Sequence, residues 1–262
     1  MKIIVCIKQV PGTTEVEVDE KNGVLKRDGV ESKMNPYDLY AIEQALLLKE
    51  KYGGTVDVIS MGPSQAHAVL KEAIYMGADK AFLVSDRRFG GADVVATSYT
   101  LSQGIGKAGN YDLIICGKQT TDGDTAQVGP EMAEFMKIEH VANVLSVLEK
   151  REAGLLIREN QENSTRVLNV PLPCLLTIEK EANTPRLPSF RRKLERINDE
   201  ITVFTLDDFA DQNPAHYGLN GSATQVERIF SPEKNVDKQI IKGTAEKVTD
   251  TLFKILQEKK FL

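Results

Sequence analysis

Short apolar runs alternate with helical patterns along the first half of the chain, and this alternation limits the possible folds more than any other feature. Residues 3–7 and 113–116 are continuous apolar runs, and residues 55–60 and 81–84 are two further predicted strands between them. Such strands are typically buried on both faces, and helices between them indicate crossover connections between parallel neighbours. The pattern predicts an α/β fold with a mainly parallel, Rossmann-like sheet.

Helical patterns fill the gaps between these strands. Asn35 suits the N-cap of the first helix, Pro36 suits its first position, and Gly53-Gly54 ends it. Asp38 follows the cap by three residues, from where its carboxylate can reach back to the cap. Further helices are predicted over residues 64–76, 92–107 and 126–136.

Beyond residue 141 the pattern changes to strands with short connections, which we expect to extend the sheet as an antiparallel edge. These strands are predicted over residues 144–148, 155–158, 166–170 and 174–178. Near the N-terminus, strict alternation over residues 15–19 and a return over residues 24–28 predict a hairpin.

The clearest helix lies near the C-terminus. Ala245, Val248, Leu252, Ile255 and Leu256 form one apolar stripe, with Lys and Glu residues opposite. Such a tail packs either on another chain or on its own domain, and the pattern alone leaves both open.

Composition excludes several functions. The chain has 262 residues, a net charge of -5, three Cys and three His. There is no basic excess to neutralise a nucleic-acid backbone, no dense disulfide framework and no metal-ligand motif. No Ser/His/Asp set is recognisable, so the side chains offer little chemistry of their own.

The N-terminal apolar run is short and ends at Lys8, whereas a signal peptide needs a longer apolar region and a cleavage site of small residues. No stretch approaches the roughly 20 apolar residues of a membrane span. These features predict a cytoplasmic protein.

The segment after the strand at residues 113–116 is the strongest local indication of a ligand. It reads Gly117-Lys118-Gln119-Thr120-Thr121-Asp122-Gly123-Asp124-Thr125-Ala126-Gln127-Val128-Gly129-Pro130. Ligands of open α/β sheets bind at the carboxyl ends of strands, and helix N-termini favour phosphate. An ordinary connection is the alternative, but the segment is long for one. We predict nucleotide binding by this segment, which is not a Walker A loop.

Three other segments follow strand ends or precede helices, and each has a simpler explanation. Residues 35–38 are explained as a helix start, residues 60–63 as a turn, and residues 85–94 as a charged surface loop. With residues 6–8, the first two could still contact one ligand with the segment above. The literal G-x-G-x-x-G match at residues 104–109 ends a helix instead of starting one, so we reject it.

Residues 180–196 carry six basic and two acidic side chains in an acidic chain. This asymmetry indicates contact with an acidic partner, and a solvated connector is an equally favoured alternative.

Taken together, these segments resemble the beta subunits of electron-transfer flavoproteins from end to end. The matching pieces are Val5-Cys6-Ile7-Lys8-Gln9-Val10-Pro11, Met34-Asn35-Pro36-Tyr37-Asp38, Ser60-Met61-Gly62-Pro63 and the residues from Cys116 to Pro130. The resemblance implies a flavodoxin-like fold, an alpha-subunit partner in a heterodimer, and an adenine nucleotide bound by these segments.

The family has two branches, and one of them is electron-bifurcating. Two segments are similar in sequence to that branch, namely Phe89-Gly90-Gly91-Ala92-Asp93 and Asp122-Gly123-Asp124-Thr125. That branch implies FAD, which takes a hydride from NADH and sends electrons to the alpha-subunit FAD and to ferredoxin or flavodoxin. The alpha-subunit flavin would in turn serve a flavin dehydrogenase of the acyl-CoA, enoyl-CoA or 2-hydroxyacid type. The alternatives are a non-bifurcating carrier with structural AMP and a nucleotide-binding sensor.

The resemblance also assigns residues. Residues 35–38 and 121–128 would hold the ADP half of the nucleotide, and residues 90–93 would lie near the flavin ring. The full cofactor-binding set is Cys6, Lys8, Asn35, Pro36, Tyr37, Asp38, Ser60, Met61, Gly90, Gly91, Ala92, Asp93, Thr97, Gly117, Gln119, Thr120, Thr121, Asp122, Gly123, Asp124, Thr125, Ala126, Gln127 and Val128.

Residues 182–192 resemble the family's recognition loop, which docks the dehydrogenase. The implied docking residues are Ala182, Pro185, Arg186, Leu187, Phe190, Arg191 and Arg192. The predicted organisation is a nucleotide-binding domain over residues 1–179, the docking loop over residues 180–196, and a C-terminal arm over residues 197–262 that packs on the alpha subunit.

Overall fold

The structure is a computed structural model, and it describes residues 1–12, 18–19, 24–25, 32–227 and 240–262. The chain divides into two compact units. One comprises Met1–Glu17 with Leu25–Glu227, and the other comprises Val18–Val24 with Arg228–Leu262. The two units are described separately below.

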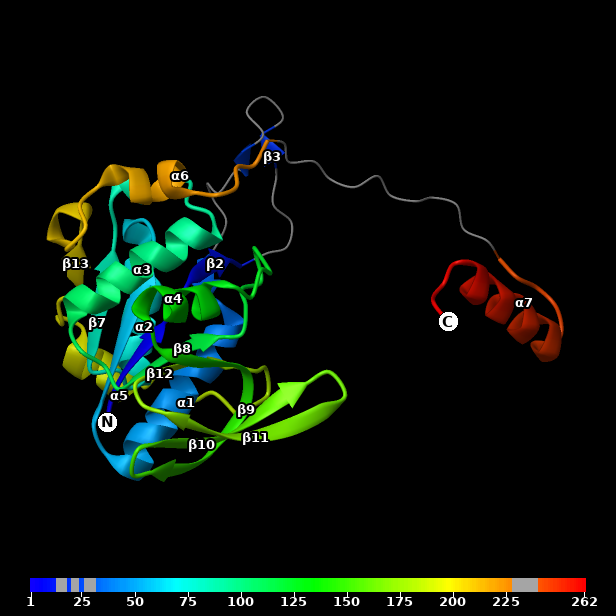
Figure 1. The fold of residues 1–262 in the computed structure, drawn as a ribbon, viewed down its shortest axis with the longest axis horizontal. Helices are drawn as coiled ribbons and strands as arrows, with labels where there is room; N and C mark the ends of the chain where they lie inside the picture. The colour runs from blue at the N-terminus through cyan, green and yellow to red at the C-terminus, as the bar shows by residue number, and fades with distance from the viewer. Residues whose placement is uncertain (13–17, 20–23, 26–31, 228–239) are drawn as a thin grey trace. The chain divides into compact units, whose positions relative to one another are not determined.

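A nine-stranded sheet forms the centre of the larger unit, in the order β11-β10-β9-β12-β8-β1-β6-β7-β13 (Figure 1). The six strands β12, β8, β1, β6, β7 and β13 are parallel to their neighbours, and β9 is parallel to β12. The strands are β1 (Lys2–Cys6), β6 (Thr55–Met61), β7 (Lys80–Val84), β8 (Leu113–Gly117), β9 (Glu139–Arg151), β10 (Gly154–Gln161), β11 (Ser164–Pro171), β12 (Cys174–Ile178) and β13 (Thr202–Phe204). The predicted α/β class and the antiparallel edge, formed by β9, β10 and β11, are confirmed.

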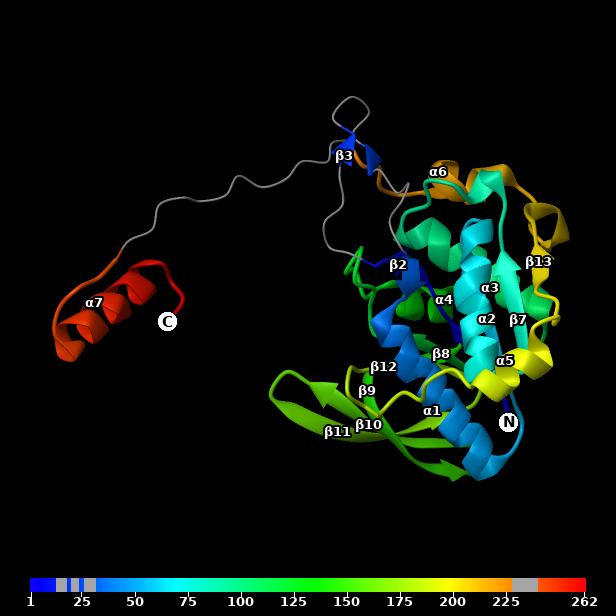
Figure 2. The same cartoon turned by 180° about the vertical axis from the view of Figure 1, so that it is seen from behind.

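Helices cover both faces of the parallel strands (Figures 1 and 2). Successive side chains of a strand point to opposite faces, so Ile3 and Val5 of β1 lie in one buried cluster and Ile4 and Cys6 in the other. The first cluster includes residues of α1 (Pro36–Tyr52) and α2 (His67–Met76), and the second includes residues of α3 (Val94–Ala108) and α4 (Val128–Met136).

Several short elements complete the larger unit. They are β2 (Gln9–Pro11), paired with β5 (Ser32–Met34), the helices α5 (Phe190–Arg196) and α6 (Gly218–Gly221), and the 3-10 turns η1 (Ser64–Ala66), η2 (Arg87–Phe89), η3 (Leu206–Asp208) and η4 (Pro214–His216). Strand β13 and helix α5 were not predicted: β13 is only three residues long and pairs with β7, and α5 lies in a polar stretch that packs on α2. Helix α4 begins at Val128 instead of Ala126, because Ala126 has a left-handed backbone with φ 58°.

The predicted hairpin over residues 15–28 lies largely outside the described residues. Two of its pieces, β3 (Val18–Asp19) and β4 (Val24–Leu25), form a two-stranded sheet. The structure thus supports strand pairing for the described part of this prediction.

The rejected glycine motif at residues 104–109 lies at the end of a helix, as expected, since α3 ends at Ala108. Gly104 lies inside α3, and a Cβ there would be 2.7 Å from Val84 Cγ2. Gly104 therefore allows α3 to approach β7 closely.

The C-terminal helix α7 (Ala245–Glu258) is the main element of the smaller unit. Thr244 caps it by accepting a hydrogen bond from the Lys247 amide, and the helix has no buried residue. The predicted helix is confirmed, and in its apolar stripe Ala245 and Leu252 are exposed while Val248, Ile255 and Leu256 are partly exposed. No helix among the described segments has the length and apolar character needed to cross a membrane.

Candidate nucleotide-binding site

A cavity of about 1140 Å³ lies where β1, β6, β7 and β8 end. Because these strands are parallel, their carboxyl ends meet at one edge of the sheet, which is where open α/β sheets bind ligands. Of the predicted residues, the cavity is lined by Cys6, Lys8, Asp38, Met61, Gly90, Gly91, Ala92, Asp93, Thr97, Gly117, Gln119, Thr120, Gly123, Thr125, Ala126, Gln127 and Val128.

A buried carboxyl joins three of the segments around this cavity. Asp38 Oδ2 accepts a hydrogen bond from the Lys8 amide at 2.7 Å, and Oδ1 accepts one from Asn35 Nδ2 at 2.8 Å. Asn35 also donates to the Gln119 carbonyl at 2.9 Å and accepts from the Thr121 amide at 3.3 Å. The exits of β1 and β8 and the start of α1 are thereby fixed to one another.

This network corrects the prediction for the start of α1. Pro36 does occupy the first turn, but the Asn35 side chain makes no capping hydrogen bond. Its amide group is used by Asp38 and by the loop after β8 instead. The sequence alone favoured a plain helix start for residues 35–38. The structure shows that these residues also hold the loop after β8.

Burial raises the pKa of the Asp38 carboxyl to about 7, against the opposing effects of the hydrogen bonds from Asn35 and the Lys8 amide and of the Lys8 charge. The carboxyl is 4% exposed. Its surroundings leave no room for a side chain at Gly117, where a Cβ would lie 2.5 Å from Asp38 Oδ1 and 2.8 Å from Tyr37.

The loop after β8 is also held by an ion pair. Lys8 Nζ lies 2.8 Å from both carboxylate oxygens of Asp122. Burial alone would raise the pKa of Asp122, but the hydrogen bond and charge of Lys8 hold it below its usual value. Within the same loop, Gln119 donates to Asp124, which has φ 53°.

Helix α4 begins directly after this loop. Its first backbone amides have no side-chain cap, because Gln127 makes no capping hydrogen bond. Gly129 allows the helix to approach β12, since a Cβ there would lie 2.7 Å from Thr177 Cγ2. Free amides at a helix start together with nearby Lys8 suit a phosphate group.

The loop after β7 forms another wall. Phe89 is buried, Gly90–Asp93 border the cavity, and Asp93 caps α3 by accepting a hydrogen bond from the Ala96 amide at 3.0 Å. The surface-loop explanation of residues 85–94 is thus too simple, because the loop is anchored at both ends.

Two thiols lie at the base of the cavity. Cys6 and Cys116 are in register on β1 and β8, and both are buried. The hydrogen bond between them and their burial raise the pKa of the Cys116 thiol well above its usual value. A protonated thiol is a poor nucleophile, and both cysteines line the cavity.

Several predicted residues do not line the cavity, namely Asn35, Pro36, Tyr37, Ser60, Thr121, Asp122 and Asp124. Asn35 instead binds the Gln119 carbonyl and the Thr121 amide, while Asp122 and Asp124 accept from the side chains of Lys8 and Gln119. Ser60 is fully buried, and its Oγ has no hydrogen-bond partner among the described residues.

Lining residues that were not predicted include Ser64, Arg87, Phe89, Leu101, Lys118 and Val226. Arg87, Phe89 and Lys118 lie inside segments that the sequence had marked, so proximity in sequence could have found them. Leu101 and Val226 carry no sequence signal, since only the fold brings the middle of α3 and a C-terminal segment to this edge.

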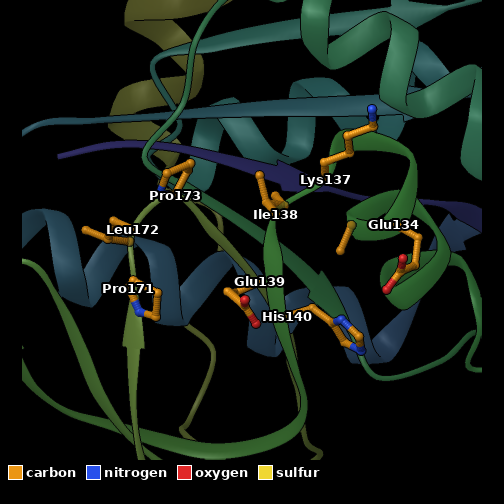
Figure 3. Close-up of a pocket in the computed structure, with 9 residues that line it drawn as sticks. Glu134, Lys137, Ile138, Glu139, His140, Pro171, Leu172 and Pro173 are labelled. Carbon is orange, nitrogen blue, oxygen red and sulfur yellow. The ribbon is translucent and has the colours of Figure 1, made fainter.

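A second hollow of about 550 Å³ lies at the amino ends of β9 and β12 (Figure 3). Figure 3 shows Glu139 and His140 on β9, together with Pro171 at the end of β11 and Leu172 and Pro173 from the connection to β12. Within the described segments, no group of three or more His, Cys, Asp or Glu side chains is arranged to hold a metal ion. We assign no chemistry to this hollow.

The predicted docking segment divides into anchored and exposed residues. Arg186 forms hydrogen bonds of 2.8 and 2.9 Å with Glu43 and one of 2.6 Å with Glu50, both on α1. Leu187 and Phe190, by contrast, are 86% and 74% exposed. The guanidinium therefore holds the segment on α1, while the neighbouring apolar side chains face outward.

The other basic residues of residues 180–196 divide in the same way. Arg192 donates to the Met76 carbonyl at 2.9 Å, and Arg196 to the carbonyls of Ala78 and Asp79. Arg191 is exposed, and within the described segments its ion pair is with Glu195 on the same helix. Much of the positive charge that the sequence indicated for a partner is thus used inside the chain.

The known proteins that resemble this chain agree with the geometry of the site. Residues 22–208 match the family model described as "Electron transfer flavoprotein domain". The chain belongs to the electron transfer flavoprotein family.

Similar members of the electron transfer flavoprotein family match the chain over most or all of its length. "Electron transfer flavoprotein subunit beta" of Clostridium acetobutylicum is 44% identical, with all of both chains covered. "Caffeyl-CoA reductase-Etf complex subunit CarD" of Acetobacterium woodii is 43% identical, again with all of both chains covered. "Protein FixA" of Sinorhizobium fredii is 40% identical over 94% of this chain and 89% of its own.

These matches confirm the resemblance to beta subunits and the role in electron transfer. A beta subunit of this family implies an alpha-subunit partner, and the family implies association with a flavin or nucleotide.

The raised pKa of Asp38 has a consequence for stability. Between pH 4 and pH 7 the folded chain keeps the Asp38 proton while the unfolded chain, with an ordinary pKa of 3.8, has lost it. The contribution of Asp38 to the free energy of unfolding must therefore fall as pH rises through this range, by on the order of 3 kcal/mol. We expect Asp38→Asn to flatten the pH dependence of urea unfolding between pH 4.5 and pH 7.

The control for this experiment is Asp208→Asn. The hydrogen bonds of Thr205 hold the pKa of Asp208 below its usual value of 3.8, so this carboxyl titrates below the window and the wild-type slope should remain. Equal slopes for Asp38→Asn and the wild type would contradict the assignment of Asp38 as a buried, protonated carboxyl.

The anchoring role of Arg186 gives a second test. Arg186→Ala leaves the Glu43 carboxylate, which is 5% exposed, without its partner, and this should lower the free energy of unfolding by about 3 kcal/mol. Arg191→Ala is the matched control, because its ion pair is exposed and we expect no measurable change. Equal stabilities of the two variants would show that Arg186 does not anchor the segment.

Proposed function

We propose that this chain is the beta subunit of a bifurcating electron-transfer flavoprotein and that its cavity binds FAD. When bound, FAD would supply the redox chemistry: it would accept a hydride from NADH, passing one electron to the alpha-subunit FAD and the other to ferredoxin or flavodoxin. The chain itself would bind, orient and shield this group.

The observation that carries the proposal is the extent of the cavity. It runs from Asp38 and the loop after β8 to Gly90–Asp93 after β7, with a volume of about 1140 Å³. Typical small-molecule sites measure roughly 300–1,000 Å³, so there is room for a dinucleotide. A mononucleotide would occupy only one end.

The two ends of the cavity differ in the chemistry they offer. Lys8 and the uncapped amides at the start of α4 suit the diphosphate of FAD. The other end presents Gly90 and Gly91, Thr97 and the apolar Leu101, which suits a flat ring with a few polar atoms. The residues present therefore fit FAD, and no proton-transfer group of the chain is required.

The docking segment would receive the dehydrogenase. Arg186 fixes its position on α1, and Leu187 and Phe190 offer exposed apolar contacts. The name of CarD refers to a caffeyl-CoA reductase complex, which favours an enoyl-CoA reductase type of partner here. A pull-down with purified dehydrogenases of the enoyl-CoA, acyl-CoA and 2-hydroxyacid types would test this, and binding of only one of the latter two would contradict it.

A non-bifurcating carrier with structural AMP is the second candidate. The features that suit a phosphate lie at Asp38 and at the start of α4, at Val128. They are complete without the Gly90–Asp93 end of the cavity, and this favours the second candidate. The two candidates differ in the nucleotides that a heterodimer contains.

The experiment is to co-express the chain with its alpha subunit, purify the heterodimer and identify the released nucleotides by chromatography and mass spectrometry. We expect two FAD per heterodimer and rapid bleaching of flavin absorbance on adding NADH. One FAD with one AMP, or flavin that NADH does not reduce, would contradict the proposal.

A further inference from the structure

A segment far along the chain is fastened to the loop that forms the Gly90–Asp93 wall. Leu219 donates its amide hydrogen to the Gly90 carbonyl at 3.1 Å. The Asp93 amide donates to Ser222 Oγ at 2.9 Å, and Ser222 Oγ donates to the Gly218 carbonyl at 2.7 Å. We call residues 217–226 the strap.

The Asp93 carboxylate joins the strap to α3 with both of its oxygens. Oδ1 accepts the hydrogen bond of the Ala96 amide that caps the helix, at 3.0 Å. Oδ2 accepts from the Thr224 amide at 2.8 Å and from the Thr224 hydroxyl at 3.0 Å. One side chain thus satisfies the start of a helix and the end of a segment 131 residues away in sequence.

Close packing fixes the rest of the strap. Tyr217 is fully buried and its ring lies 5.5 Å from that of Phe89. Gly218 has φ 55°, and a Cβ there would lie 2.2 Å from the Arg88 carbonyl oxygen. Only glycine permits this approach, so the strap is fitted to the backbone of the loop and is not a chance contact.

The strap also reaches the cavity. Val226 is one of the lining residues, whereas Thr224 is not. Thr224 can therefore affect a bound ligand only through the residues it holds. A substitution of Thr224 thus tests the positioning of the wall without removing a direct contact with the ligand.

We propose that Asp93 is a positioning residue whose carboxylate fastens the strap to the Gly90–Asp93 loop and so fixes the wall beside the ring end of a bound flavin. The inference rests on the proposed function. It assigns Asp93 a different task from the direct cofactor contact that the resemblance implied.

The two ends of the cavity make the proposal specific. Asp38, Lys8 and the loop after β8 hold the ADP end independently of the strap. Loosening the strap should thus weaken binding of FAD, which reaches the wall, and leave binding of ADP, which does not. A general loss of structure would weaken both.

The experiment measures FAD and ADP binding to the full-length chain by calorimetry for the wild type, Asp93→Asn and Thr224→Val. Asn keeps an acceptor for the Ala96 amide and remains a good N-cap, but it cannot accept all the hydrogen bonds that the carboxylate accepts. We expect the Kd for FAD to rise about tenfold in Asp93→Asn and several-fold in Thr224→Val, with the Kd for ADP changed less than twofold.

Thr205→Val is the matched control. Thr205 also donates its hydroxyl to an aspartate, Asp208, at 2.9 Å, but it does not contact the strap or line the cavity. We expect wild-type affinity for both ligands. Hydrogen–deuterium exchange gives a readout independent of ligands: the amides of residues 90–96 and 219–224 should exchange faster in Asp93→Asn and Thr224→Val only.

The outcomes are distinguishable. Unchanged FAD affinity or unchanged exchange in Thr224→Val would overturn the positioning role, as would equal losses for FAD and ADP. A wild-type chain that binds ADP but not FAD would contradict the proposed function itself, whatever the variants do.

Discussion

The buried carboxyl of Asp38 is the interaction on which the rest of the site depends. It accepts hydrogen bonds from the Lys8 amide and from Asn35, and Asn35 in turn holds the loop after β8. These contacts bring together the ends of two neighbouring parallel strands and the start of α1. A carboxyl without these partners would be costly to bury, so the network and the geometry of the sheet edge form together.

The loops that form the cavity around Asp38 are each held by a different set of contacts. The loop after β8 is held by Asn35 and by the Lys8–Asp122 ion pair, while the loop after β7 is held by Asp93 and the strap. Each wall depends on contacts between residues far apart in sequence. This explains how a chain with few reactive side chains can form a specific site: its polar groups shape the cavity, and the chemistry belongs to what binds there.

The parts of the fold that the sequence predicted are those set by local patterns. The apolar run of β1 and the turn glycines after α1 specify their structures with little help from the rest of the chain. Strand β13 has three residues, and it forms only because β7 offers an unpaired edge. Its own stretch, Ile201 to Phe204, is rich in apolar and β-branched residues but too short to identify a strand from its period.

In the site, too, some features follow from local sequence and others only from folding. The loop over residues 117–130 was recognisable because its length and small residues are unusual for a connection. The role of Asn35 was not, since an Asn before a Pro is fully explained as a helix start until Gln119 is seen beside it. Arg186 and Asp93 are similar cases: charged residues in predicted loops suggest ligands or partners, but Glu43 and Thr224 are visible only after folding.

We propose that one cavity at this sheet edge holds a complete dinucleotide. The most direct measurement is an experimental structure of the purified heterodimer with its natural nucleotides. The account predicts an adenine–diphosphate density between Asp38 and the start of α4, continuous with a flavin ring beside Gly90–Asp93. Density for AMP alone, with protein filling the space beside Gly90 and Gly91, would contradict it.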